Sequence, residues 1–143
     1  MKNPYWKSCY LAACLVATAN CNADIVVVGG SDAPELSPTA AKQIFLKKTN
    51  TLPNGVAATP IDLSDSNEVK WAFYKQITGK DAAQIYSYWS RAVFTGAGSP
   101  PDQVNTAQEL KRRLSKDSGV IGYIDEKDLQ PGMKVLLRIA ATQ

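Results

Sequence analysis

One short segment of this sequence strongly restricts the fold that the chain can adopt. Residues 24–29 read Asp-Ile-Val-Val-Val-Gly, a continuous apolar run rich in β-branched side chains. Such residues favour strands, and a strand without polar alternation is typical of a strand buried on both faces. A sheet that is covered on both faces needs helices on either side, so the run indicates a layered α/β protein.

Four helices are indicated by the residues that begin them. Ser37 is expected to cap a helix whose first residue is Pro38, because proline fits the first helical position. Three further helix starts have capping-box spacing, with an acidic or hydroxyl residue three positions before Glu or Gln: Asp65 with Glu68, Asp81 with Gln84, and Thr106 with Glu109. Gly79 should end the second of these four helices.

Further strands are expected at residues 57–63, 119–124 and 134–139. Pro60 should place its strand at a sheet edge or mark a strand entry, since proline cannot donate to the ladder. Residues 95–105, with two glycines and two prolines, predict a long loop. Strands interleaved with helices predict a single three-layer α/β lobe with a mostly parallel sheet, with Phe73 and Trp89 in its core.

The first 23 residues have the three-part layout of a secretory signal. Lys2 and Lys7 are positive, residues 11–18 are apolar, and residues 21–23 read Cys-Asn-Ala, a small-x-small cleavage site. The apolar run is shorter than the roughly 20 residues that a membrane-spanning helix needs. We therefore expect residues 1–23 to be a signal peptide, residues 24–143 to be one domain, and the product to be periplasmic or secreted.

A lipid anchor is the alternative to soluble export. Residues 11–14 read Leu-Ala-Ala-Cys, which has the form of a lipobox ending at Cys14. The motif lies close to Lys7, and most of the apolar run follows it rather than precedes it, which favours the soluble product.

The composition of residues 24–143 excludes several classes of function. All three cysteines lie in the first 23 residues and the chain has no histidine, so a thiol nucleophile, an imidazole base and the usual zinc sites are excluded. We expect no enzyme, no cofactor and no metal. Two of the lysines lie in the signal segment, so cleavage lowers the net charge from +3 to +1. That charge indicates no nucleic-acid binding and no stable membrane insertion.

Several segments resemble the phosphate ABC-transporter substrate-binding protein family. They are Ile44-Phe45-Leu46-Lys47, the loop Phe94-Thr95-Gly96-Ala97-Gly98-Ser99-Pro100-Pro101, and the strand Gly119-Val120-Ile121-Gly122-Tyr123. The loop resembles that of the short, single-lobe members. The resemblance implies one lobe of a type II periplasmic binding protein, phosphate as ligand and an ABC transporter as partner. Full-length members have two lobes, so half of the usual cleft would be absent here.

The resemblance also implies where phosphate would bind. Full-length members hold it with an Arg followed by Ser-Gly-Thr at a helix N-terminus, six residues before a Phe. Counting back from Phe73 puts residues 67–69, Asn-Glu-Val, at the Ser-Gly-Thr positions and Asp62 near the Arg position. Carboxylates there oppose a bound anion.

An anion site can be proposed on the residues that follow two strands. Helix N-termini and nearby cations favour negative ligands, which selects Gly30, Ser31, Ser64, Ser66, Asn67, Lys70 and Arg91 as candidates. The alternative is that the glycines form a turn, that Asp65 is an ordinary helix cap, and that the cations are solvated.

Two function classes remain open. The first is a small-anion binding protein, with phosphate as the ligand that the resemblance implies. The second is an exported module that docks another protein or itself. Aromatic residues on the second and third helices, among them Trp71, Tyr74 and Tyr86, favour either a partner surface or core packing. The basic residues Lys111, Arg112, Arg113 and Lys116 favour a solvated face or an acidic partner.

Overall fold

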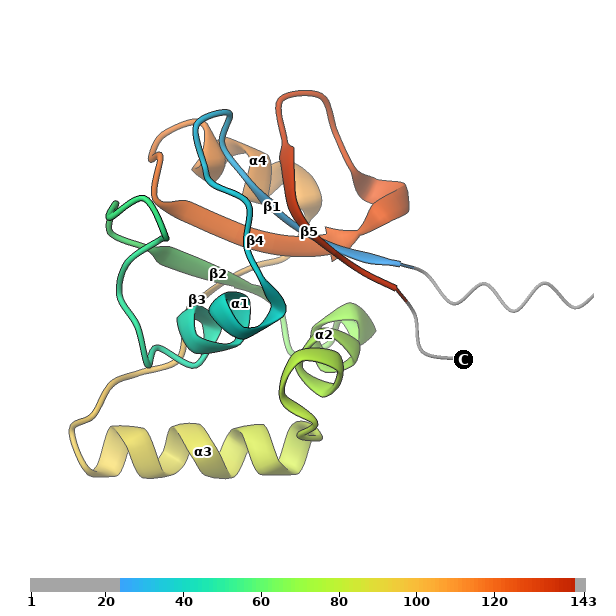
Figure 1. Ribbon diagram of the computed structural model, residues 1–143. Helices are drawn as coiled ribbons and strands as arrows, with labels where there is room; N and C mark the ends of the chain where they lie inside the picture. Colours follow the sequence, from blue (N-terminus) through green and yellow to red (C-terminus); the bar gives the residue numbers. More distant parts are fainter. Residues whose placement is uncertain (1–23, 141–143) are drawn as a thin grey trace, which may run out of the picture.

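The computed structural model describes residues 24–140, which form a mixed α/β structure (Figure 1). Residues 1–23, where the sequence predicts a signal peptide, lie outside the described residues together with the three cysteines. The elements in chain order are β1 (Ile25–Gly29), α1 (Pro38–Phe45), β2 (Thr59–Leu63), α2 (Glu68–Thr78), α3 (Ala82–Phe94), β3 (Asp102–Val104), α4 (Ala107–Leu114), β4 (Val120–Asp125), the 3₁₀ turn η1 (Glu126–Asp128) and β5 (Lys134–Ile139).

The strands form one sheet in the order β3-β2-β4-β1-β5. β2 pairs in parallel with both β3 and β4, whereas β1 pairs antiparallel with both β4 and β5. Four strands therefore run in one direction and β1 alone runs in the other, which refines the prediction of a mostly parallel sheet. β1 lies between two strands and is buried along its whole length, as its continuous apolar sequence predicts.

Helices cover both faces of this sheet. Gly122 lies against Leu110 of α4, while the next residue, Tyr123, contacts Phe45 of α1 and Phe73 of α2. Because successive residues of a strand point to opposite faces, α4 covers one face and α1 and α2 cover the other. Figure 1 shows this arrangement, with α3 lying beyond α1 and α2 and farther from the sheet. The predicted three-layer α/β lobe is confirmed.

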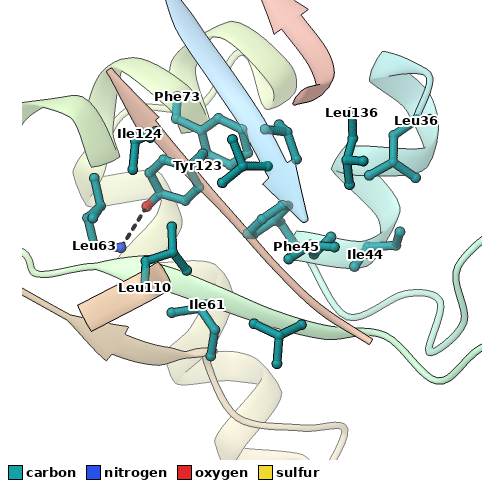
Figure 2. Close-up of a cluster of buried hydrophobic side chains, with 14 of the residues drawn as sticks. Leu36, Ile44, Phe45, Ile61, Leu63, Phe73, Leu110, Tyr123, Ile124 and Leu136 are labelled. Atoms are coloured by element: carbon teal, nitrogen blue, oxygen red, sulfur yellow. Dashed lines mark hydrogen bonds between the residues drawn. The ribbon is translucent and has the colours of Figure 1, made fainter. Parts of the chain in front are cut away.

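Stacked aromatic rings fill the space between the sheet and α2 (Figure 2). The rings of Phe73 and Tyr123 are stacked with their centroids 3.8 Å apart, and Phe45 meets Phe73 edge-on at 4.9 Å. Phe73 and Trp89 are both buried, as the helical periodicity predicts. Tyr74 is also fully buried, so core packing is the correct interpretation for that residue.

Three of the four helices begin at the residues that the sequence predicts. Ser37 caps α1 with Pro38 at its first position, Asp81 and Gln84 form a reciprocal capping box, and Thr106 caps α4. The second start differs, because Asn67 rather than Asp65 caps α2. Gly79 ends α2 with φ 72°, a left-handed conformation that glycine adopts without strain.

One strand prediction needs correction. The predicted loop at residues 95–105 contains β3, which pairs in parallel with the end of β2. Consequently β2 is an interior strand, and Pro60 lies at its entrance, which is one of the two positions predicted for this proline.

Candidate functional site

A polar cleft of about 510 Å³ lies where β2 and β4 end. These two strands are parallel, so their carboxyl ends meet at the same edge of the sheet, where α/β folds commonly bind ligands. The first residues of α2 and α4 face the same cleft. Its lining residues are Leu63, Asn67, Val69, Asn105, Thr106, Ala107, Gln108, Ile124, Asp125, Lys127, Asp128, Leu129 and Gln130.

The two helix N-termini at this cleft are already capped by their own chain. The Asn67 Oδ1 accepts a hydrogen bond from the Val69 amide at 3.0 Å, and the Thr106 Oγ1 accepts one from the Glu109 amide at 3.1 Å. The charged lining residues are Asp125, Lys127 and Asp128, and the Lys127 Nζ lies 3.6 Å from the Asp125 Oδ2. The cleft therefore carries no excess of positive charge for an anion.

A buried ion network lies beside the start of α2. The Lys70 Nζ is 2.6 Å from the Asp65 Oδ1 and 3.6 Å from the Asp62 Oδ2. Lys70 is 5% exposed and Asp62 is 1% exposed. A buried charge is tolerated only when it is paired. Both carboxylates supply that pairing, so the ammonium is neutralised within the chain.

Asp65 is held in place by neighbours from two other elements. The Tyr86 hydroxyl of α3 donates to the Asp65 Oδ2 at 3.0 Å, and the Gln103 Nε2 of β3 donates to the Oδ1 at 3.0 Å. The Trp71 indole N–H donates to the Asp65 backbone oxygen at 2.9 Å. The hydrogen bond from Lys70 is the main influence that lowers the pKa of Asp65 below its ordinary 3.8. Asp65 is therefore an ionised partner of Lys70, not a free helix cap.

Two buried tyrosines enclose the second carboxylate. The Tyr74 hydroxyl donates to the Asp62 Oδ1 at 2.9 Å, and the Tyr123 hydroxyl donates to the same oxygen at 3.0 Å. The Tyr123 oxygen in turn accepts from the Leu63 amide at 3.3 Å, the dashed line in Figure 2. Burial raises the pKa of Asp62 to about 6, although the charge of Lys70 and these hydrogen bonds act in the opposite direction. Burial, together with the Asp62 charge, also raises the pKa of both tyrosines.

The structure brings together four of the residues proposed from the sequence for an anion site. Ser64, Ser66 and Asn67 lie on the connection from β2 to α2, where the two serine hydroxyl oxygens are 3.1 Å apart, and Lys70 follows within the first turns of α2. Of these, Asn67 lines the cleft and Lys70 belongs to the buried ion network.

The other three candidates lie elsewhere. Because β1 is antiparallel to β4, with Gly29 opposite Ile121, Gly30 and Ser31 leave the sheet at the edge opposite Ser64. They line a separate cleft with Lys111 and Lys116, which also contains Asp32 and Asp117. Arg91 is an exposed residue of α3 and lines a shallow groove along that helix.

Sequence reasoning did not identify the polar residues that complete the cleft. Asp125 ends β4, whereas Asn105 and Gln130 lie on connections, and their meeting depends on the order of the strands. The buried pairing of Asp62 could have been predicted from the sequence. This carboxylate lies between two apolar residues of a strand, where it needs buried partners. Within residues 24–140, no cluster of three or more potential metal ligands occurs, and no helix is long and apolar enough to cross a membrane.

Comparisons with known proteins support the fold but do not define a family. No protein-family model matches the chain, and no curated protein matches it. Solved structures that resemble this chain include three that each cover 80% of it. They are a protein assigned as a phosphate ABC transporter substrate-binding protein from Clostridium perfringens with bound phosphate, an ABC-type phosphate transport receptor from Vibrio cholerae, and PstS from Borrelia burgdorferi.

The likeness is one of fold, not of sequence. The TM-scores are 0.62, 0.61 and 0.58, and the identities are 13%, 11% and 11%, in the same order. The matches cover 45%, 46% and 47% of those proteins, so this chain spans a little less than half of each. The fold that the resemblance to phosphate ABC-transporter substrate-binding proteins implies is thus confirmed. The matched protein from Clostridium perfringens is described as a substrate-binding protein, and that from Vibrio cholerae as a transport receptor.

Proposed function

We propose that this chain is an exported single-lobe protein of the phosphate-receptor fold that acts as a protein-interaction module. One observation carries the proposal: the Lys70 ammonium at the start of α2 is enclosed by Asp62 and Asp65. The cation best placed to hold a phosphate at this helix is therefore already paired within the chain. No catalytic role is proposed, because the fold neighbours are binding proteins.

Phosphate binding at α2 would have to overcome this internal pairing. A phosphate that reached Lys70 would displace the Asp65 carboxylate, or would lie close to two negative charges that disfavour it. Outside this network the cleft is open to water, where an ion pair contributes only about 0–1 kcal/mol. Micromolar affinity requires about 8 kcal/mol. A few exposed contacts do not supply that free energy.

The third helix supplies the surface that an interaction module needs. Phe94, Val93 and Tyr86 are 93%, 58% and 50% exposed. Large exposed aromatic side chains are the residue types that most often anchor protein interfaces. They lie on one helix that is remote from the sheet, so a partner could cover them without disturbing the core.

Small-anion binding is the second candidate, and the fold neighbours favour it. The Clostridium perfringens neighbour holds phosphate, the Vibrio cholerae neighbour is a phosphate transport receptor, and all three proteins are about twice as long as this chain. In this alternative the chain delivers phosphate or another small anion to an ABC transporter. A second body would then have to close over the cleft at the ends of β2 and β4 and supply the missing cations.

Calorimetry against phosphate at low ionic strength separates the two candidates. We expect the purified monomer to bind phosphate at millimolar level or not at all. Asp65→Asn leaves Lys70 with one fewer carboxylate partner and should strengthen binding, whereas Asp102→Asn, at an exposed carboxylate near Arg113, should not. Micromolar affinity in a protein shown by light scattering to be monomeric, and lost in Lys70→Ala, would restore the anion-binding candidate.

Export is part of the same proposal and has its own test. The cleavage pattern at residues 21–23 places the mature N-terminus at Asp24. Intact-mass analysis of the protein recovered from outside the cytoplasm should give the mass of residues 24–143. A lipid-modified species that begins at Cys14 would show that the chain is anchored instead.

A further inference from the structure

The outward face of α3 is unusual for a helix surface in contact with water. α3 has thirteen residues, and Arg91 is its only charged one. Residues 83, 87, 90 and 94, which recur at helical spacing, are all exposed, whereas Ile85 and Trp89 on the other side are buried. An exposed helix face normally carries several charges. The composition of this face is that of a surface which another molecule covers.

The small and large residues of this face are arranged so that the face is complementary to a second copy of itself that runs in the opposite direction. Along the middle of the exposed face lie Ala83, Ser87, Ser90 and Phe94, so the small end and the large end are equally far from the midpoint. When two copies of α3 pack antiparallel about a two-fold axis, Phe94 of each copy lies over Ala83 of the other, and Ser87 lies beside Ser90. The serines allow the two helices to approach closely. This reciprocity is the property of an isologous interface.

The same two-fold rotation places each edge of this face beside the equivalent edge of the other copy. Tyr86 and Val93 lie along one edge, and each would contact the same apolar edge of the other copy. Along the other edge runs a groove of about 330 Å³, with Lys80 and Asp81 at one end and Arg91 at the other. Antiparallel packing brings Arg91 of each copy toward Asp81 of the other. It also sets the negative end of each helix dipole against the positive end of its neighbour.

We propose that the partner of this face is a second copy of the chain, which forms a two-fold dimer through antiparallel α3 helices. This inference rests on the proposed function and names its partner. The α3 helix is about 20 Å long, so the interface belongs to the small, transient class. The dimer is expected to form and dissociate with concentration.

α3 can serve this purpose because it is fixed to the rest of the molecule by its other side. The Tyr88 hydroxyl donates to the Leu46 backbone oxygen at 2.7 Å, and Trp89 is buried. The side chains of Ser87, Ser90 and Phe94 on the outward face are exposed and take no part in that attachment, whereas Tyr86 at its edge contributes a hydrogen bond to Asp65. Substitutions on the outward face therefore test association without testing folding.

Sedimentation over a wide concentration range tests the dimer. The expected result is a monomer–dimer equilibrium that Phe94→Ser weakens about ten-fold or more, with an unchanged denaturation midpoint. Leu129→Ser, at another exposed apolar residue, is the matched control and should leave the equilibrium unchanged. A wild-type chain that is monomeric at every concentration, or a dimer that persists in Phe94→Ser, would overturn the proposal.

Single cysteines test the antiparallel geometry. In a chain with Cys9, Cys14 and Cys21 replaced by serine, Ser87→Cys lies near the two-fold axis and should cross-link on mild oxidation. Ala83→Cys should not, because eleven residues separate positions 83 and 94 and place the two copies of position 83 about 16 Å apart. Parallel helices would place each position beside its own counterpart, so cross-linking at both positions would contradict the proposal.

The outcome can be separated from the fate of the proposed function. A monomeric protein that also fails to bind phosphate contradicts only the dimer, whereas a monomeric protein with micromolar phosphate affinity contradicts both.

Discussion

The buried carboxylate of Asp62 should give the protein a pH-dependent stability opposite in sign to that of most carboxylates. Its pKa is raised from 3.8 to about 6, mainly by burial. Because the folded chain binds this proton more tightly than the unfolded chain does, the stabilisation is complete below pH 3.8 and is lost as the pH rises through about 6. The whole difference amounts to about 3 kcal/mol of unfolding free energy.

The change in unfolding free energy is best measured between about pH 5 and about pH 7.5. Across that interval the unfolding free energy should fall by about 1.4 kcal/mol because of Asp62 alone. Asp65 has the opposite shift, but its lowered pKa places its contribution at a pH below its ordinary 3.8, outside this interval. The effect of Asp62 is therefore separable from that of its neighbour.

Urea denaturation at a series of pH values measures this quantity. Asp62→Asn keeps an oxygen that can accept from both tyrosine hydroxyls, and it should remove the pH dependence within the interval. Asp32→Asn, at an exposed carboxylate on a loop after β1, should keep the wild-type slope. A wild-type stability that does not fall between these pH values, or a fall that persists in Asp62→Asn, would refute the reasoning.

Three further substitutions test the packing of the fold by denaturation. Phe73→Ala should cost about 3–5 kcal/mol because the ring is stacked on Tyr123 in the core, and an unchanged midpoint would show that the face of α2 is misassigned. Gly122→Ala should cost about 1–3 kcal/mol, since its Cβ would lie 2.5 Å from a methyl carbon of Leu110; a neutral effect would mean that α4 can move away. Gly79→Ala should cost roughly 1–2 kcal/mol through its φ of 72° alone, because no atom lies near the added methyl, and Gly79→Asn should cost less.

Local signals in the sequence were sufficient for most elements of the fold. The β-branched run at residues 24–29, the Ser37-Pro38 start and the Asp81 capping box each depend on neighbours within four residues. The predicted start of α2 was wrong because it depends on residues that are distant in the sequence. Asp65 has the spacing of a cap, but its carboxylate is engaged by Lys70, Tyr86 and Gln103, two of which lie on other elements.

The candidate site was only partly predictable, because it depends on strand direction. Gly30 and Ser64 both follow strands, but β1 and β2 run in opposite directions, so the two residues lie at opposite edges of the sheet. β3 was also missed: its three residues follow two prolines, and its strand conformation depends on pairing with β2. The burial of Lys70 depends on its ion pair with Asp62. No motif in the sequence indicates that these two residues are paired.

The central claim is that the chain itself neutralises the cation at the start of α2. Nuclear magnetic resonance of the Lys70 ammonium and of the backbone amides of residues 66–69, followed during a phosphate titration, tests this claim most directly. We predict that the ammonium keeps its hydrogen bond to Asp65 and that the amide signals do not saturate below millimolar phosphate. A saturable shift of both sets of signals at micromolar phosphate would contradict the account.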